Sequence, residues 1–283
     1  MKTCLVVVAL SLSPHLAWGW WGDGHAIVTR AAAAALPPEA PAFLREGGER
    51  AAHCSYDPDL IKSRAVPHLE EAEQPEHFID LELLQGAPRP DGRYAFLALC
   101  ARMNLPPARV GLLPYAVVEW SERLTMALAE HRRWPGDEAI QTKALVYAGI
   151  LSHYAADLCQ PLHTTVDYDG RVDGGGRSPH SGVHEKMDAL IERRGFTPED
   201  LALGATVEVL PDLVAAAAAT LAASHALVDR VYALEGRLND TDDGEVADFA
   251  RERGRAAAAF TASLYLTAWQ QSADVKLPGW LKR

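Results

Sequence analysis

The chain has 283 residues, 48% of them hydrophobic, and its 38 acidic residues outnumber 27 basic ones to give a net charge of −11. An acidic surface repels nucleic acid, so the basic surface of a general DNA-binding protein is excluded and any phosphate substrate must be attracted locally. No repeat of solenoid period is present, and no stretch beyond the N-terminal segment has the pattern of a transmembrane helix. Long alanine-rich segments instead predict an all-α protein built from packed helices.

Residues 1–19 have the pattern of a signal peptide. Lys2 precedes an apolar run that is too short to span a bilayer, and small residues precede the expected cut between Gly19 and Trp20. The mature chain would be secreted or periplasmic. Its new α-amino group on Trp20 would have a pKa of about 7.7 to 8, so the lone pair would be available to a metal ion together with the imidazole of His25.

The mature chain, residues 20–283, is predicted to form one domain of helices joined by irregular segments. Apolar spacing and helix-ending prolines predict helices over residues 24–36, 41–50, 114–132, 138–159, 183–194, 211–234 and 245–271. Prolines, glycines and charged residues predict a loop-rich passage over 54–80, a break over 86–93 and a long glycine-rich loop over 164–182. The last two helices contain almost no metal-binding residue types, which predicts a scaffold role for them.

Cysteines do not provide a framework for this fold. Cys4 leaves with the leader, and Cys54, Cys100 and Cys159 remain. Three cysteines allow one disulfide and one free thiol, and the sequence does not say which two would pair. A bound metal is therefore the better candidate for linking the helices.

The densest group of metal-ligand residue types lies within residues 153–163. His153 and Asp157 are four residues apart, so both side chains lie on one face of a helix, while Pro161 ends that helix and lets His163 approach independently. Imidazole and carboxylate suit zinc in sites that keep an open position. Alone, the His-Asp pair also fits a solvated surface pair, but the eleven-residue string is more specific than that.

Further ligand types stand before and after this string. His184 and Asp188 are again four apart at the start of a helix, and the flexible loop before them could bring them back to the string. Upstream, His77 follows a segment with two candidate carboxylates, Asp57 and Asp59. Taken singly, each of these also fits an ordinary half-buried or surface residue. Together the candidate ligands are Trp20, His25, Asp59, His77, His153, Asp157, His163, His184 and Asp188.

In this order the candidate ligands resemble those of the secreted trinuclear-zinc enzymes, a family of single-strand-specific nucleases and zinc-dependent bacterial phospholipases C. The resemblance runs from Trp20 to about Asp188, and more loosely to the C-terminal helices. It implies a multi-helix all-α domain that holds three Zn²⁺ ions per chain, with Asp157 bridging two of them. The ligand sets that it implies are Asp59, His77 and His153 on one side of Asp157, the Trp20 amine and carbonyl with His25 on the other, and His163, His184 and Asp188 for the third ion.

Within this family the nuclease branch fits better. Four residues separate Trp20 from His25, as in the nucleases, and the last ligand pair ends in Asp188, where the phospholipases have Glu. The chain also departs from the family pattern, with Ala156 where Gly is common and Cys159 in place of a residue that is often His. The intervals from Asp59 to His77 and from His77 to His153 are also longer than usual.

A second nuclease-like motif lies upstream. The stretch from Asp59 to Lys62 resembles one in which a metal-binding Asp is followed three residues later by a phosphate-contacting Arg or Lys, and this favours Asp59 over Asp57. Phe78 and Asp80 fall where the nucleases stack a base and hydrogen-bond its edge. Stacking on an aromatic side chain is worth roughly 1 to 3 kcal/mol per base.

The resemblance therefore implies a zinc-dependent endonuclease that hydrolyses single-stranded DNA or RNA to 5′-phosphate products, with Asp59, Lys62 and Asp157 as catalytic residues and no stable protein partner. A phospholipase C acting on phosphocholine lipids is an alternative with the same chemistry, and the sequence does not exclude it. A secreted zinc-binding protein without turnover and a helical interaction protein without metal are alternatives of other classes. The zinc content of the mature protein would separate these last two.

Overall fold

The computed structural model describes residues 22–172 and 178–282. Every regular element among these residues is a helix, and the β contacts there are two isolated bridges, between Ile79 and Gly111 and between Tyr168 and Gly170. The predicted all-α class is therefore confirmed. The expected signal peptide and Trp20 lie outside the described residues, as does part of the predicted glycine-rich loop.

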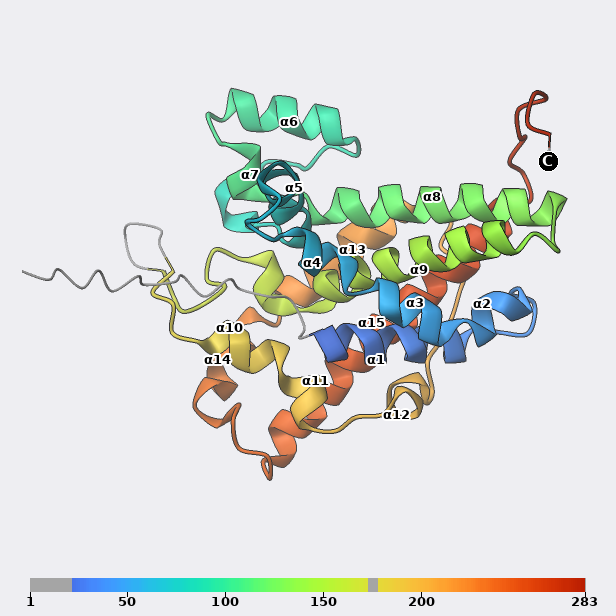
Figure 1. Ribbon diagram of the computed structural model, residues 1–283. Coiled ribbons are helices and arrows are strands. Elements are labelled where there is room, and N and C mark those ends of the chain that lie inside the picture. Colours follow the sequence, from blue (N-terminus) through green and yellow to red (C-terminus); the bar gives the residue numbers. More distant parts are fainter. Residues whose placement is uncertain (1–21, 173–177, 283) are drawn as a thin grey trace, which may run out of the picture.

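Four long helices form the centre of the molecule: α1 (Gly22–Ala35), α8 (Leu113–Arg133), α9 (Glu138–Cys159) and α15 (Gly244–Gln271). Helix α9 contacts α8, α15 and α1, and Figure 1 shows α8 and α9 side by side with α15 crossing obliquely behind them. Helix α9 begins where the Asp137 side chain accepts hydrogen bonds from two backbone N–H groups of the first turn, as a helix N-cap does. The bounds predicted for this helix match those observed.

The C-terminal half of α9 is enclosed by the other helices, and every residue from 151 to 165 is buried. A close approach of α3 (Gly48–Cys54) contributes to this enclosure. A Cβ atom on Gly149 of α9 would lie 2.2 Å from the carbonyl oxygen of Ala51, so only glycine permits this packing distance. The tight α3–α9 contact brings the residue after α3, Ser55, against the buried face of α9 that carries the candidate ligands.

The passage over residues 54–80, expected to be loop-rich, is a series of short helices, and that prediction was wrong in detail. Its prolines occupy first-turn positions, where the missing N–H group costs nothing and the fixed φ angle favours a helix start. The elements of this passage and the turn after it are α4 (Asp57–Ile61), α5 (Pro67–Glu73), η1 (Gln74–His77) and η2 (Leu81–Leu84). They lie beside α6 (Arg93–Arg102) and α7 (Pro107–Val110), which gather near one end of α8 in Figure 1.

Two predicted helices are divided in the structure. The segment 41–50 separates at Gly47 into α2 (Ala42–Glu46) and α3, and the segment 211–234 separates after His225 into α13 (Leu213–His225) and α14 (Val228–Leu234). The segment 183–194 is likewise two short helices in close succession. The remaining elements are η3 (Pro161–Thr164), α10 (Val183–Asp188), α11 (Leu190–Arg193), α12 (Pro198–Ala202) and η4 (Glu235–Arg237).

The Leu213–Arg237 segment is long and apolar enough to cross a membrane by length and composition, with a mean hydropathy of 1.2, and 28% of its most apolar window is buried. The sequence pattern predicts no transmembrane helix in this segment. Its apolar character comes mainly from alanine, and the helix is interrupted between α13 and α14. Ala217 and Leu221 of this segment pack into the main hydrophobic core. These features fit a helix of the protein core as well as a membrane span.

Candidate metal centre

The buried end of α9 carries His153 and Asp157, one helical turn apart and both fully buried. The Nδ1–H group of His153 lies 2.8 Å from the backbone oxygen of Ser55, which makes Nδ1 the donor and leaves Nε2 with a free lone pair. After the helix ends, η3 brings His163 to the same region, and its Nδ1 lies 2.6 Å from the backbone oxygen of His77. In both histidines a backbone carbonyl fixes the ring so that Nε2 is the available ligand atom.

A first cluster joins three chain segments around one point. His77 Nδ1 lies 3.0 Å from His153 Nε2 and 3.1 Å from Asp157 Oδ2, while His153 Nε2 is 3.3 Å from the same oxygen. Asp59 Oδ1 stands 3.9 Å from both ring nitrogens. Ligand atoms placed tetrahedrally about 2.0 to 2.1 Å from a zinc ion are about 3.3 Å apart, so these spacings match a tetrahedral zinc site. Asp59, and not Asp57, lies in this cluster.

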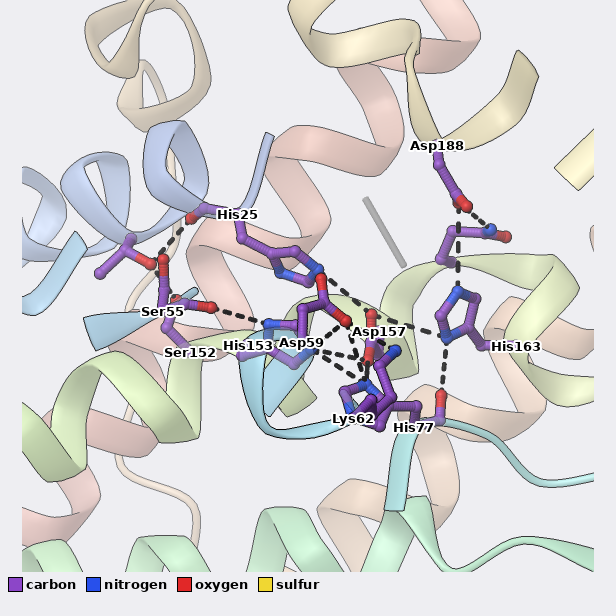
Figure 2. Close-up of polar contacts among 12 residues, drawn as sticks. His25, Ser55, Asp59, Lys62, His77, Ser152, His153, Asp157, His163 and Asp188 are labelled. Carbon is purple, nitrogen blue, oxygen red and sulfur yellow. Dashed lines mark hydrogen bonds and ion pairs between the residues drawn. The ribbon is translucent and has the colours of Figure 1, made fainter. Parts of the chain in front are cut away.

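The second oxygen of Asp157 faces other partners. Asp157 Oδ1 lies 3.4 Å from His25 Nε2 and 3.5 Å from His163 Nδ1. The His25 ring stacks on that of His153, with centroids 3.8 Å apart and planes inclined by 17°. His25, His153 and Asp157 form a second candidate cluster, and Figure 2 shows the Asp157 carboxylate lying between His25 and His163. The Trp20 amine, expected as a further ligand here, lies outside the described residues.

A third cluster consists of His163, His184 and Asp188. The two Nε2 atoms are 3.1 Å apart, and Asp188 places one oxygen 3.2 Å from His184 Nε2 and the other 4.0 Å from His163 Nε2. Gln160 donates a 2.6 Å hydrogen bond to Asp188 Oδ1, and its own Oε1 accepts from the backbone of Leu162. The structure thus brings α10 back to His163, as the sequence predicts.

The ionisation of these groups favours metal binding at neutral pH. Burial lowers the pKa of His25 to about 4, with repulsion from His153 adding to the effect, and burial together with His163 holds the pKa of His184 well below its usual value. Both rings are therefore neutral ligands at pH 7. Burial alone would raise the pKa of Asp157, but the surrounding His163 and His153 rings hold it well below its usual range, so this carboxylate is ionised.

Asp188 differs from Asp157 because burial holds its pKa well above the usual range, against the hydrogen bond from Gln160. A cation beside Asp188 would favour its ionised form. Several buried atoms that face other candidate ligands also have no hydrogen-bond partner, among them Nε2 of His25 and one oxygen each of Asp157 and Asp188. Buried polar atoms are rarely left unpaired in folded proteins, so these donors fit a site that holds metal ions. Imidazole nitrogen and carboxylate oxygen are the donor types that zinc takes in such sites.

Lys62 lies inside this region, where its Nζ atom is 2.6 Å from Asp59 Oδ1 and its side chain is almost fully buried. The ammonium group is thus an ion-pair partner of a candidate ligand. The sequence placed it as a phosphate contact and did not indicate this pairing. A buried positive charge here offsets part of the negative charge that Asp59 and Asp157 bring together.

Phe78 and Asp80 follow His77 directly and are half-buried beside the clusters. The backbone N–H group of the residue between them, Ile79, donates a 2.8 Å hydrogen bond to His163 O, which ties this segment to the third cluster. Gly111 has a φ angle of 92°, and a Cβ atom there would lie 2.1 Å from the Phe78 oxygen. The close approach of Gly111 therefore fixes the backbone that presents Phe78 and Asp80.

The structure also identifies contacts of the site that the sequence analysis did not select. Ser55 and Gln160 orient His153 and Asp188, Glu73 lies 3.6 Å from His77 Nε2, and the Tyr168 ring meets that of His184 with centroids 5.8 Å apart. Tyr168 lies in the glycine-rich loop, and Gln160 lies in the ligand-rich string 153–163, so the sequence indicated weakly that both are near the site. The other two contacts depend on tertiary packing alone.

The three cysteines of the described chain, Cys54, Cys100 and Cys159, are free. Burial raises the pKa of the Cys159 thiol to about 12, so it stays protonated, and it packs among aliphatic side chains rather than in a ligand cluster. Zinc binds the thiolate form of cysteine. Cys159 is therefore a core residue, although it stands only two residues after Asp157 on α9.

Replacing Asp80 with asparagine is expected to change how the stability of the protein depends on pH. Burial, with repulsion from Glu82, raises the pKa of Asp80 to about 7 in the folded protein. From about pH 4 to pH 7 the folded state holds a proton that the unfolded state releases, so this group makes the protein less stable as pH rises. Asp80→Asn removes that loss, so the free energy of unfolding at pH 8 should increase by on the order of 2 kcal/mol. This increase is smaller than the full pKa shift would give, because Asp80 is partly hydrated.

Urea denaturation at pH 5 and pH 8 measures this effect. The difference in unfolding free energy between Asp80→Asn and the unmodified protein should be larger at pH 8 than at pH 5. Asp91→Asn, which also removes one carboxylate but from an exposed residue, is the matched control. Equal differences at the two pH values for Asp80→Asn would contradict the shifted pKa.

Comparisons with known proteins give little beyond this geometry. No protein-family model matches the chain, and no curated protein matches it. Among solved structures, the chain is similar to "Alpha Toxin from Clostridium Absonum" at 16% sequence identity and a TM-score of 0.45, over 92% of this chain and 68% of that one. The chemistry of the site therefore rests on the side chains and distances described above.

Proposed function

We propose that this protein is a secreted zinc-dependent phosphodiesterase that hydrolyses single-stranded nucleic acid. The observation that carries the proposal is the position of Asp157, whose two oxygens face different clusters of buried histidines. Such a carboxylate can bridge two cations a few ångströms apart, which is the arrangement that stabilises both oxygens of an in-line phosphoryl displacement. Three adjacent clusters of His and Asp support a site for up to three ions.

The residues that would hold the ions follow from the clusters. One ion would lie among Asp59, His77, His153 and Asp157, a second beside His25 and Asp157 with the Trp20 amine, and a third among His163, His184 and Asp188. When bound, zinc supplies a Lewis acid that lowers the pKa of water and offsets the negative charge of the phosphoryl group.

The chain's own residues have complementary tasks in this proposal. Asp157 holds two neighbouring sites at a fixed separation, and the backbone contacts of His153 and His163 keep their Nε2 atoms directed at the clusters. Lys62 supplies a buried positive charge beside Asp59, where a phosphate group would otherwise meet a strongly acidic protein. Electrostatic groups that are fixed in place before the reaction need no reorganisation during it.

The preference for single-stranded nucleic acid rests on Phe78 and Asp80. Both are half-buried and are held beside the third cluster through the hydrogen bond from Ile79 to His163. An unpaired base can stack on an aromatic ring in such a position, whereas a base inside a duplex cannot reach it. With a pKa of about 7, Asp80 can present either a donor or an acceptor to the edge of a base near neutral pH.

Replacing Phe78 with alanine should raise KM for a single-stranded oligonucleotide by about 5- to 150-fold, because stacking contributes roughly 1 to 3 kcal/mol per base. The value of kcat/KM for methyl 4-nitrophenyl phosphate, a small diester without a base, should stay unchanged. Steady-state kinetics on both substrates measure the effect, and Tyr94→Ala, on an exposed aromatic residue, is the control. Equal losses on both substrates would show that Phe78 supports the site without stacking a base.

A phospholipase C activity is the second candidate, and one observation favours it. Leu60, Val66 and Leu69 are 60%, 40% and 50% exposed and all lie between the candidate ligands Asp59 and His77 along the chain. Exposed aliphatic side chains next to a site are suited to contact with a lipid surface. The same side chains carry no positive charge for a nucleic acid backbone.

The two candidates are separated by giving the zinc-loaded mature protein a single-stranded oligonucleotide, a matched duplex and phosphatidylcholine vesicles. The proposal expects hydrolysis of the single strand well above that of the duplex, with 5′-phosphate ends, and none of the lipid. Hydrolysis of the lipid alone would replace the nuclease assignment with phospholipase C. Bound zinc without hydrolysis of any diester would support the zinc-binding protein without turnover.

A further inference from the structure

His77 differs from the other histidines of the clusters in which ring nitrogen faces the ligands. Its Nδ1 atom lies 3.0 Å from His153 Nε2 and 3.1 Å from Asp157 Oδ2, whereas its Nε2 atom points away from them. His153 and His163 use the opposite arrangement, with Nδ1 on a backbone oxygen and Nε2 toward the clusters. The orientation of His77 therefore needs a partner on its Nε2 side.

That partner is Glu73, the last residue of α5. Glu73 Oε1 lies 3.6 Å from His77 Nε2, one helical turn along the chain, which is within ion-pair range but longer than a hydrogen bond. Only 14% of the Glu73 side chain is exposed, and the buried Nε2 atom has no hydrogen-bond partner among the described residues. No backbone carbonyl takes this position among the described contacts of His77 Nε2. A carboxylate on the outer nitrogen of a ligand histidine fixes the tautomer and makes the ring a stronger electron donor than a carbonyl does.

Glu73 is itself held in place by Tyr154. The Tyr154 hydroxyl donates a hydrogen bond to Glu73 Oε1, and the ring, only 2% exposed, lies with its centroid 5.6 Å from that of His77. Tyr154 follows His153 on α9, so the helix that supplies His153 and Asp157 also fixes the carboxylate behind His77. The three residues thus form a chain of contacts from Tyr154 to Glu73 to His77.

The backbone around His77 is fixed by a separate ion-pair network. Arg93 donates to both carboxylate oxygens of Glu76, the neighbour of His77, and also to both oxygens of Glu119 on α8. This clamp holds the position of η1 but makes no contact with the His77 ring. Asp157 and His153 contact the ring at Nδ1, and Glu73 is the charged side chain that approaches it at Nε2.

We propose that Glu73, held by Tyr154, is a positioning residue that keeps the His77 ring protonated on Nε2 and presents Nδ1 to a zinc ion. This inference rests on the proposed zinc-dependent function and adds a residue to its site. Glu73 is not a member of the three ligand clusters, since it meets His77 on the far side of the ring. Its contribution to hydrolysis is therefore indirect and acts through metal binding.

Glu73→Gln tests the proposal because glutamine keeps the size of the side chain and can still accept from Tyr154 but carries no charge. The mature protein is stripped of metal and titrated with zinc against a chromophoric chelator. The ion held by Asp59, His77 and His153 should dissociate about 10- to 100-fold more readily than in the unmodified protein, the range for loss of an outer partner of a ligand histidine. Tyr154→Phe should weaken binding less, because it loosens Glu73 without removing it.

Nitrogen NMR of ¹⁵N-histidine-labelled protein gives a readout that a purely structural role would not move. The zinc-loaded unmodified protein should show His77 protonated on Nε2, and Glu73→Gln should shift that resonance or mix the two tautomers. Glu71→Gln, on an exposed residue of the same helix, is the matched control and should change neither affinity nor spectrum. If Glu73→Gln fails to fold, Tyr154→Phe serves for both measurements.

The results separate this inference from the proposed function. Unchanged zinc affinity and an unchanged His77 tautomer in Glu73→Gln would overturn the role of Glu73 and leave the phosphodiesterase proposal intact. Zinc binding by the unmodified protein without hydrolysis of any diester would overturn the proposed function, while weaker zinc binding by Glu73→Gln would still establish the positioning role. Equal destabilisation of the metal-free and zinc-loaded variant would make Glu73 a structural residue only and would also refute the inference.

Discussion

Replacing Asp157 with asparagine should lower kcat/KM for single-stranded DNA by at least about 10³-fold, the upper range for loss of one fixed group that stabilises transition-state charge. Asparagine has the same shape but only one oxygen, and Asp157 uses both, with Oδ2 facing His77 and His153 and Oδ1 facing His25 and His163. The amide nitrogen of the variant would direct a donor at ring nitrogens that must stay free for metal. Steady-state kinetics at saturating zinc and elemental analysis of zinc measure the two consequences.

Zinc content should fall together with activity, from near three ions per chain to about one, because two clusters share Asp157 while His163, His184 and Asp188 can still bind an ion. Asp57→Asn is the matched control, since Asp57 lies two residues from Asp59 but in none of the clusters. It should keep both zinc and activity. An Asp157→Asn protein with full zinc content and undiminished hydrolysis would refute the bridging role of this carboxylate.

The long helices could be predicted because their signals are local. Helix α9 has the bounds expected from the sequence since an Asp N-cap precedes it and a proline follows its end, and both act within one turn. The passage over 54–80 was predicted wrongly because a proline in a sequence usually indicates the end of a helix. Here the prolines lie in the first turns of short helices, where proline is favoured, and the residues around them determine where those helices start. The break at Gly47 likewise gave no periodic signal.

For the candidate site, too, the sequence predicts the features that depend on nearby residues but not those that depend on tertiary contacts. The four-residue spacing of His153 and Asp157 fixes their common face, and the structure places both in the clusters. Which nitrogen of each ring is available could not be read from the sequence, because the partners come from distant segments, as Ser55 does for His153. Lys62 illustrates the limit, since its spacing from Asp59 suggested a phosphate contact and gave no sign that the two side chains pair.

Removing zinc with a strong chelator should lower the melting temperature of the mature protein by at least about 5 °C. An ion held at 100 times its Kd stabilises the folded state by about 2.7 kcal/mol, and for a chain of this size about 1 kcal/mol corresponds to 2 to 4 °C. A single occupied site thus accounts for about 5 to 11 °C. Differential scanning calorimetry with chelator, and again after zinc is restored, measures the change and its reversibility.

The loss should be large because the clusters bury several groups that lack other partners. Asp157 and Asp188 are fully buried, and one oxygen of each has no hydrogen-bond partner, nor does Nε2 of His25. Leaving such groups unpaired costs roughly 1 to 3 kcal/mol each. Asp157→Asn serves as the comparison, since it should lose less of its stability to chelator. A melting temperature that is the same with and without zinc would mean that these buried groups do not hold metal, and the assignment of the centre would be wrong.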